Sequence, residues 1–169
     1  MGSIHKPPVC NLALALAQAG KLKLFVETGT FQGDSLRWAS QHFELVWTVE
    51  INAQYQAEAK AKVGPLPNVQ FVLGNSAERL ARICPALSGP ALFWLDAHAG
   101  AGFFGNADDC PLLAELDACL VQARAEHCIL IDDAGPSWRR PRHRSTTANG
   151  RASMRSSPSC CAGAVTTSR

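Results

Sequence analysis

Acidic side chains stand at the ends of the apolar runs of this sequence, where they could do chemistry. Glu27 closes the run LKLFVE, Glu50 closes LVWTVE, and Asp96 follows ALFWL. Asp132 and Asp133 follow the last such run, CILI. Carboxylates at such places accept hydrogen bonds from hydroxyl groups, bind divalent cations or take up protons. The acids therefore mark candidate binding and catalytic positions.

The segment after Glu27 reads TGTFQGDS and contains Gly29 and Gly33. Glycines let the backbone approach a ligand closely, and a helix that starts after them offers unpaired N–H groups. Glu50 stands 23 positions after Glu27, where a carboxylate can accept both hydrogen bonds of a ribose diol. Taken alone, these features describe an ordinary strand-to-helix turn and a solvated charge. Together they favour a nucleotide-type ligand site.

Short apolar runs alternate with helix-like segments along the first 131 residues. This alternation predicts β-α-β units in a Rossmann-like, doubly wound, mostly parallel α/β sheet that is covered on both faces. Ligands bind such sheets at the carboxyl ends of the strands. The predicted strands are Leu22–Glu27, Leu45–Glu50, Val69–Leu73, Ala91–Leu95 and Cys128–Ile131. The predicted helices are Asn11–Ala19, Asp34–Gln41 with Asp34 or Ser35 as its cap, Asn52 to about Gly64, Ala77–Ile83 and Pro111–Ala125.

Six segments in this order resemble class I S-adenosylmethionine-dependent methyltransferases: FVETGTFQGDS, WTVEI, VLGNSAERL, FWLDAHAG, CPLLAEL and ILIDDA. The resemblance spans about Lys23 to Ala134 and is closest to a bacterial branch with the patterns VETGTxxGDS and WLDAH. It implies methyl transfer from S-adenosylmethionine, and we expect the acceptor to be an oxygen of a small polar metabolite or a sugar.

The resemblance also implies roles for the residues of the first loop and the next strand ends. Glu27, Gly29 and Gly33 would line the methionine and ribose side, Glu50 would hold the ribose hydroxyls, and Asn75 with Ser76 would face the adenine. Asn75 stands where the family usually has Asp. The expected cofactor-binding residues are Glu27, Gly29, Thr30, Gly33, Asp34, Glu50, Asn75 and Ser76.

A second acidic cluster is predicted where the strands before Asp96 and Asp132 lie side by side. Asp96, Asp132 and Asp133 together could bind Mg²⁺, as in metal-dependent O-methyltransferases, where the ion acidifies a substrate hydroxyl. The alternatives are a turn cap at Asp132 or Asp133 and a hydrogen bond that Asp96 accepts from the substrate or from the cofactor amine. His98 is a candidate general base or an ordinary loop residue. The expected catalytic residues are Asp96, His98 and Asp132.

Length and composition predict one domain in residues 1–134 and a separate tail in residues 135–169. The chain has 169 residues and a formal net charge of +2. The tail holds seven arginines and no acid, which leaves nine basic residues against 14 acidic ones before it. No apolar run is long enough for a membrane helix and no secretory signal is recognisable, so we expect a cytoplasmic protein that does not bind membranes.

The tail composition, rich in Arg, Ser and Pro, predicts disorder and an incomplete domain that lacks its C-terminal strands. We explain the unusual tail by a frameshift near Ala134. If the tail is encoded by GC-rich codons, another reading frame of the same bases admits a translation with apolar residues, as a continuing domain would have. Nucleic-acid binding is not expected, because the tail has one aromatic residue, Trp138, and no basic helix. A small-molecule substrate is the expected partner, and the oligomeric state stays open.

Two other functions remain open at this point. A nicotinamide-dependent oxidoreductase uses a similar sheet, but the first loop lacks G-x-G-x-x-G, and Glu27 would meet the pyrophosphate with like charge. A carboxylate there suits a cationic sulfonium or an amino group better. The chain could also be a non-catalytic remnant of a methyltransferase domain.

Overall fold

The computed structural model of the chain describes residues 3–97, 111–121 and 126–132. Several predictions fall outside these residues. They concern His98, the loop 100–109, the last turn of the helix predicted to reach Ala125, Asp133 and the tail 135–169.

Five parallel strands form one sheet in the order β3-β2-β1-β4-β5. The strands are β1 (Leu24–Thr28), β2 (Leu45–Glu50), β3 (Val69–Leu73), β4 (Ala91–Leu95) and β5 (Cys128–Ile131). The predicted α/β sheet is confirmed, and the bounds of the last four strands agree with the prediction. The first strand starts two residues later than predicted, because the Leu22 N–H donates instead to the Ala17 carbonyl at the end of the preceding helix.

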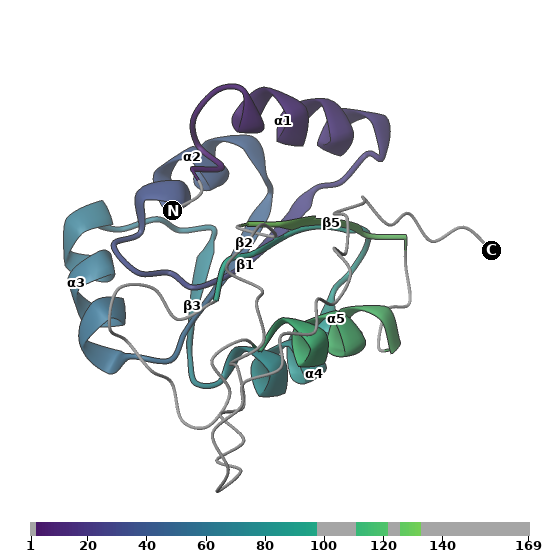
Figure 1. Cartoon of the computed structure of the whole chain (residues 1–169). Helices are drawn as coiled ribbons and strands as arrows, with labels where there is room; N and C mark the ends of the chain where they lie inside the picture. Colours follow the sequence, from purple (N-terminus) through teal and green to yellow (C-terminus); the bar gives the residue numbers. More distant parts are fainter. Residues whose placement is uncertain (1–2, 98–110, 122–125, 133–169) are drawn as a thin grey trace, which may run out of the picture.

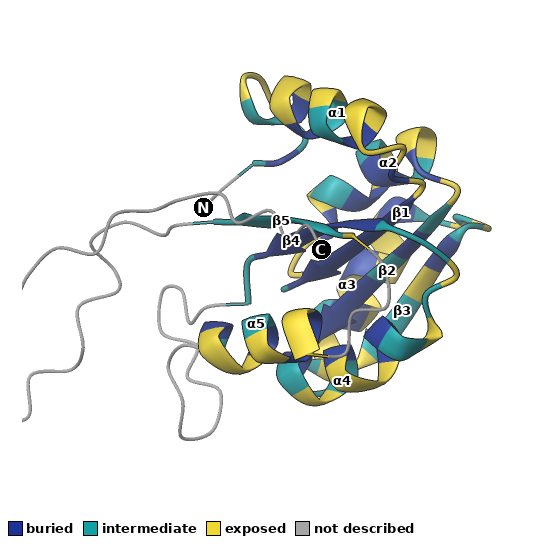
Figure 2. Cartoon of the chain, turned by 90° about the vertical axis from the view of Figure 1, so that its right-hand side faces the viewer, coloured by how far each residue is buried: buried dark blue, intermediate teal, exposed yellow. Residues whose placement is uncertain are grey.

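Helices cover both faces of the sheet (Figure 1). The helices are α1 (Val9–Ala19), α2 (Asp34–His42), α3 (Ala53–Val63), α4 (Ser76–Ala86) and α5 (Leu112–Val121). Helices α1, α2 and α3 share one apolar core with Phe25 and Trp94, and α4 and α5 share a second core with Val26 and Phe93. The central strands β1 and β4 are buried along their whole length (Figure 2). The sheet is therefore doubly wound, as expected.

Three helices begin one or two residues from the prediction: α1 at Val9 and not Asn11, α4 at Ser76 and not Ala77, and α5 at Leu112 and not Pro111. Asn52 caps α3 as expected, with its side-chain oxygen accepting from the N–H groups of Gln54 and Tyr55. The prediction that Asp34 or Ser35 caps α2 is wrong, since Gly33 is the cap residue and no side chain bonds there.

A membrane span is not found among the residues that the structure describes, since none of their helices is both long and apolar enough to cross a bilayer.

Candidate functional site

The side chains of Glu27 and Glu50 lie on the same face of the sheet. Residues alternate between faces along a strand, so Glu27 shares its face with Phe25, and Glu50 shares its face with Thr48 and Val46. Phe25 and Val46 both belong to the core under α1, α2 and α3. The two acids are also close enough for the charge of Glu50 to raise the pKa of Glu27. The structure therefore brings the two predicted acids together.

Glu27 is enclosed within the protein, with 1% of its surface exposed. Thr48 donates a hydrogen bond to its Oε1 atom at 2.8 Å, and Ser35, in the first turn of α2, donates to Oε2. Burial raises the pKa of Glu27 to about 7, and the two hydroxyl donors and Glu50 modify that shift. Glu27 thus joins β1, β2 and α2, and its direct contact with a ligand stays a prediction.

The Glu50 carboxylate is held by two backbone donors from different segments. The Phe31 N–H, in the first loop, donates to Oε2 at 2.8 Å, and the Asn52 N–H donates to Oε1 at 2.9 Å. Each oxygen keeps further acceptor capacity, because a carboxylate offers about four lone-pair sites. The carboxylate therefore has a fixed direction and can still accept hydrogen bonds from hydroxyl groups of a ligand.

The first loop passes directly against the end of β4. Gly29 has a φ of +84°, and a Cβ atom there would lie 2.5 Å from the backbone oxygen of Asp96. The Asp96 N–H in turn donates to the carbonyl and the hydroxyl of Thr28, at 3.2 Å each. Gly29 is thus required by both its conformation and the close approach. The contact brings the backbone of Asp96 to the first loop.

The other loop residues that we expected at the cofactor have partners within the protein. Gly33 has a φ of +72° and packs against Val63 and Ala59 of α3. The Thr30 hydroxyl bonds to the hydroxyl of Thr48 in the interior. Asp34 lies on the surface in an ion pair with Lys62 at 2.6 Å, so the structure does not bring it to Glu50.

Asn75 and Ser76 begin α4 beside the end of β3. The Oδ1 atom of exposed Asn75 accepts from the Glu78 N–H at 3.2 Å and so caps the helix, while Ser76 is buried. The Gly74 N–H donates to the Glu50 carbonyl at 2.8 Å. The turn that carries Asn75 is therefore joined to the end of β2, where Glu50 stands.

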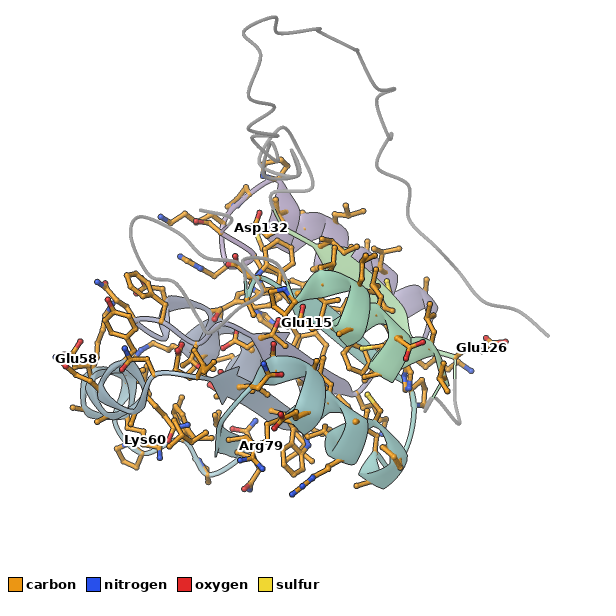
Figure 3. All side chains as sticks on the ribbon, turned by 60° about the horizontal axis from the view of Figure 1, so that its bottom comes forward. Glu58, Lys60, Arg79, Glu115, Glu126 and Asp132 are labelled. Carbon is orange, nitrogen blue, oxygen red and sulfur yellow. The ribbon has the colours of Figure 1, made fainter. Side chains whose placement is uncertain are left out.

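Asp96 and Asp132 follow neighbouring strands, as predicted. Leu95 is opposite Ile131 in the register of β4 and β5, and the Asp132 N–H donates to the Leu95 carbonyl at 3.0 Å. Figure 3 shows Asp132 at this end of β5. Within the described residues no group of three Asp, Glu, His or Cys side chains could hold a metal ion. The predicted magnesium site also needs Asp133, which lies outside these residues.

Sequence reasoning missed three residues that shape the site. Thr48 and Ser35 hold Glu27, and Phe31 holds Glu50 through its backbone N–H. One signal for Thr48 was available, because it stands two positions before Glu50 on the same strand and so shares its face. The contact of Phe31 was not readable from the sequence, since it depends on the path of the loop.

Comparisons with known proteins identify the fold. No protein-family model and no curated protein matches the sequence. The structure is similar to an O-methyltransferase from Bacillus cereus in complex with SAH, with a TM-score of 0.57 and 19% identity over 75% of this chain and 56% of that one. It is similar to the O-methyltransferase TomG from Streptomyces achromogenes in complex with SAM, with a TM-score of 0.54 and 19% identity over 78% and 62%.

A third similar structure is cofactor-bound Rv0187 from MTB, with a TM-score of 0.54 and 22% identity over 75% of this chain and 55% of that one. The chain thus spans little more than half the length of these proteins. At these identities the likeness concerns the fold. The parallel five-stranded sheet, its strand order and these structural neighbours show that the chain has the class I S-adenosylmethionine-dependent methyltransferase fold.

Proposed function

We propose that the chain binds S-adenosylmethionine at the carboxyl ends of β1, β2 and β3 and belongs to an enzyme that transfers its methyl group to an oxygen of a small polar metabolite or sugar. The observation that carries the proposal is the Glu50 carboxylate, fixed by the N–H groups of Phe31 and Asn52 beside the glycine-containing first loop. A carboxylate fixed in this way can accept hydrogen bonds from both hydroxyl groups of a ribose.

An apolar rim beside Glu50 supports an adenosyl ligand. Phe31, Ile51 and Leu73 follow or end three neighbouring strands, and 37%, 54% and 43% of their respective surfaces are exposed. Leu73 is opposite Glu50 in the strand register. Large apolar side chains exposed next to a fixed carboxylate suit a ligand with a flat base and a ribose. The Asn75 amide at the start of α4 would then meet the edge of the adenine.

The proposed catalytic residues stand at the neighbouring strand ends. Bound S-adenosylmethionine supplies an electrophilic methyl group. Asp96 or Asp132 would accept the proton that the substrate hydroxyl loses as its oxygen bonds to the methyl carbon, the carbon–sulfur bond breaks and S-adenosylhomocysteine leaves; His98 is a further candidate base. The protein contributes chiefly position and proton removal.

Magnesium is a separate part of the proposal. Asp96 and Asp132 follow neighbouring strands and would supply two carboxylates, and a third oxygen ligand would have to come from Asp133. Isothermal titration of the chain with MgCl₂ tests the site. Binding that is lost in Asp132→Asn would support it, and heats equal to dilution would contradict it.

Isothermal titration with S-adenosylhomocysteine and, separately, with NAD tests the cofactor. We expect binding of S-adenosylhomocysteine and none of NAD, because the first loop lacks the glycine pattern that a pyrophosphate needs. NAD binding without S-adenosylhomocysteine binding would favour the oxidoreductase alternative. Failure of both would favour a non-catalytic remnant.

The role of Glu50 has its own variant and control. Glu50→Gln keeps one acceptor oxygen but places an amide N–H₂ against one of the two backbone N–H donors, so we expect the affinity for S-adenosylhomocysteine to fall about 10- to 100-fold. Glu58→Gln is the matched control. Glu58 lies on the outer side of α3 (Figure 3) and bonds there to the exposed Gln54. The Glu58→Gln variant should therefore bind S-adenosylhomocysteine as tightly as the wild type does. Equal losses in both variants would refute the assignment of Glu50.

A further inference from the structure

The first loop contains a bulky residue in a conformation that favours glycine. Phe31 has a φ of +44°. In this region the backbone of a residue with a large side chain is strained, and such strain persists only where neighbouring contacts impose it. The contacts of Phe31 must therefore hold its turn in place.

Two contacts act on Phe31 from outside the loop. Its backbone N–H donates to the Glu50 carboxylate at 2.8 Å. Its ring lies edge-to-face against the ring of Tyr55, with centroids 5.2 Å apart and planes at 78°. The first contact joins the turn to β2, and the second joins it to the first turn of α3.

Tyr55 is itself tied to the segment that holds the other oxygen of Glu50. Its N–H donates to the Asn52 side chain at 3.3 Å, and the Asn52 N–H donates to Glu50 Oε1 at 2.9 Å. Asn52 and Tyr55 thus belong to one short, capped start of α3. Asn52 holds the Oε1 atom of Glu50 directly. Tyr55 contacts the ring of Phe31, and the backbone N–H of Phe31 holds the Oε2 atom of Glu50.

We infer that Tyr55 is a positioning residue: its ring holds the strained turn of Phe31, and this turn holds the Glu50 carboxylate in the direction that a ribose diol needs. The consequence for affinity rests on the proposed adenosyl site. The consequence for the Phe31–Glu50 hydrogen bond does not depend on any ligand.

Truncation of Tyr55 tests both consequences in the full chain. Tyr55→Ala should raise the Kd for S-adenosylhomocysteine about 3- to 10-fold, the range expected for loss of one aromatic pair. Tyr55→Phe keeps the ring and should restore the affinity. Gln54→Ala, at the neighbouring exposed position of α3, is the control for a general effect on the helix.

A second background separates positioning from a direct effect of Tyr55 on the ligand. Phe31→Gly removes the ring and adopts a positive φ without strain. In this background Tyr55→Ala should not change the Kd further. If Tyr55→Ala weakens binding by the same factor with and without the Phe31 ring, the inference is wrong.

Hydrogen exchange of the Phe31 amide decides the inference without a ligand. We expect Tyr55→Ala to speed exchange at Phe31 at least 3-fold, while the amide of Val63 at the far end of α3 keeps its rate. Equal Phe31 rates in Tyr55→Ala and wild type would overturn the inference. Absence of S-adenosylhomocysteine binding to the wild type would instead contradict the proposed function, and the exchange rates would still decide the role of Tyr55.

Discussion

At the scale of residues, the two acids predicted from the strand ends have different environments and so different roles. Both are buried, but Glu50 accepts hydrogen bonds from two backbone N–H groups at the end of β2, whereas Glu27 accepts from the hydroxyls of Thr48 and Ser35. Two hydroxyl donors do not offset the loss of water around an ionised carboxylate, which is why the pKa of Glu27 rises to about 7. We therefore expect the ionisation of Glu27 to affect the stability of the fold.

The pH dependence of unfolding tests this role. The pKa of Glu27 is higher in the folded protein than the ordinary 4.5, so folding favours the protonated form. The contribution of Glu27 to the free energy of unfolding falls as the pH rises from about 4.5 to about 7, by up to about 3 kcal/mol. Glu27→Gln has no proton to lose and should remove this fall.

Urea denaturation at pH 5 and pH 8 measures the difference. We expect the wild type to lose more stability between these values than Glu27→Gln does, and Glu27→Gln to equal or exceed the wild type at pH 8. The same pH dependence in both proteins would show that Glu27 ionises as freely in the folded chain as in the unfolded one.

At the scale of elements, Gly29 allows the loop after β1 to lie against the backbone at the end of β4. Gly29 and Gly64 both have a positive φ, of +84° and +71°. A Cβ at Gly29 would meet the backbone of Asp96, whereas a Cβ at Gly64 would have no atom within 4 Å. Alanine variants of Gly29 and Gly64 can therefore distinguish the loss of stability caused by backbone strain from the loss caused by steric collision.

Alanine substitutions at the two glycines should therefore differ. Gly64→Ala carries only the strain of a backbone conformation that non-glycine residues rarely adopt, and should lower the free energy of unfolding by about 1–3 kcal/mol. Gly29→Ala adds a collision with backbone that cannot move aside, so we expect a larger loss of about 3–5 kcal/mol. Urea denaturation of both variants measures the two losses. Equal losses would mean that the first loop does not approach Asp96 as closely as described.

The start of α3 gives a further test at this scale. Asn52→Ala removes the acceptor for the N–H groups of Gln54 and Tyr55, so stability should fall by about 1 kcal/mol in thermal or urea unfolding. Asn52→Asp keeps an acceptor at the cap and should recover most of this loss. An unchanged stability in Asn52→Ala would argue against the cap.

Elements were predictable from the sequence where burial alone decides them. The run ALFWL is apolar throughout and buried along its whole length, and the structure places a strand at those residues. The start of α2 was not predictable, because the side chains of Asp34 and Ser35 bond to partners 28 and eight positions away instead of capping. The same holds for the site. The acids at the strand ends could be predicted from the sequence, whereas the contacts of Phe31 with Glu50 and Tyr55 could not, because they depend on the path of the loop.

At the scale of the whole molecule, the parallel sheet gathers segments from distant parts of the sequence at one edge. The ends of β1, β2 and β3 bring together the first loop, Glu50 and the turn before α4, and the ends of β4 and β5 bring together Asp96 and Asp132. In our proposal the first group of residues holds the cofactor and the second group acts on the substrate. The chain covers 56% of the Bacillus cereus O-methyltransferase to which it is similar, so methyl transfer and its acceptor belong to our proposal.

The most direct test of the account is a crystal structure of the chain with S-adenosylhomocysteine. We expect the two ribose hydroxyls within hydrogen-bond distance of the Glu50 carboxylate, and the adenine between Ile51, Leu73 and Asn75. Density for the ligand at any other place, with Glu50 still bound only to Phe31 and Asn52, would contradict it.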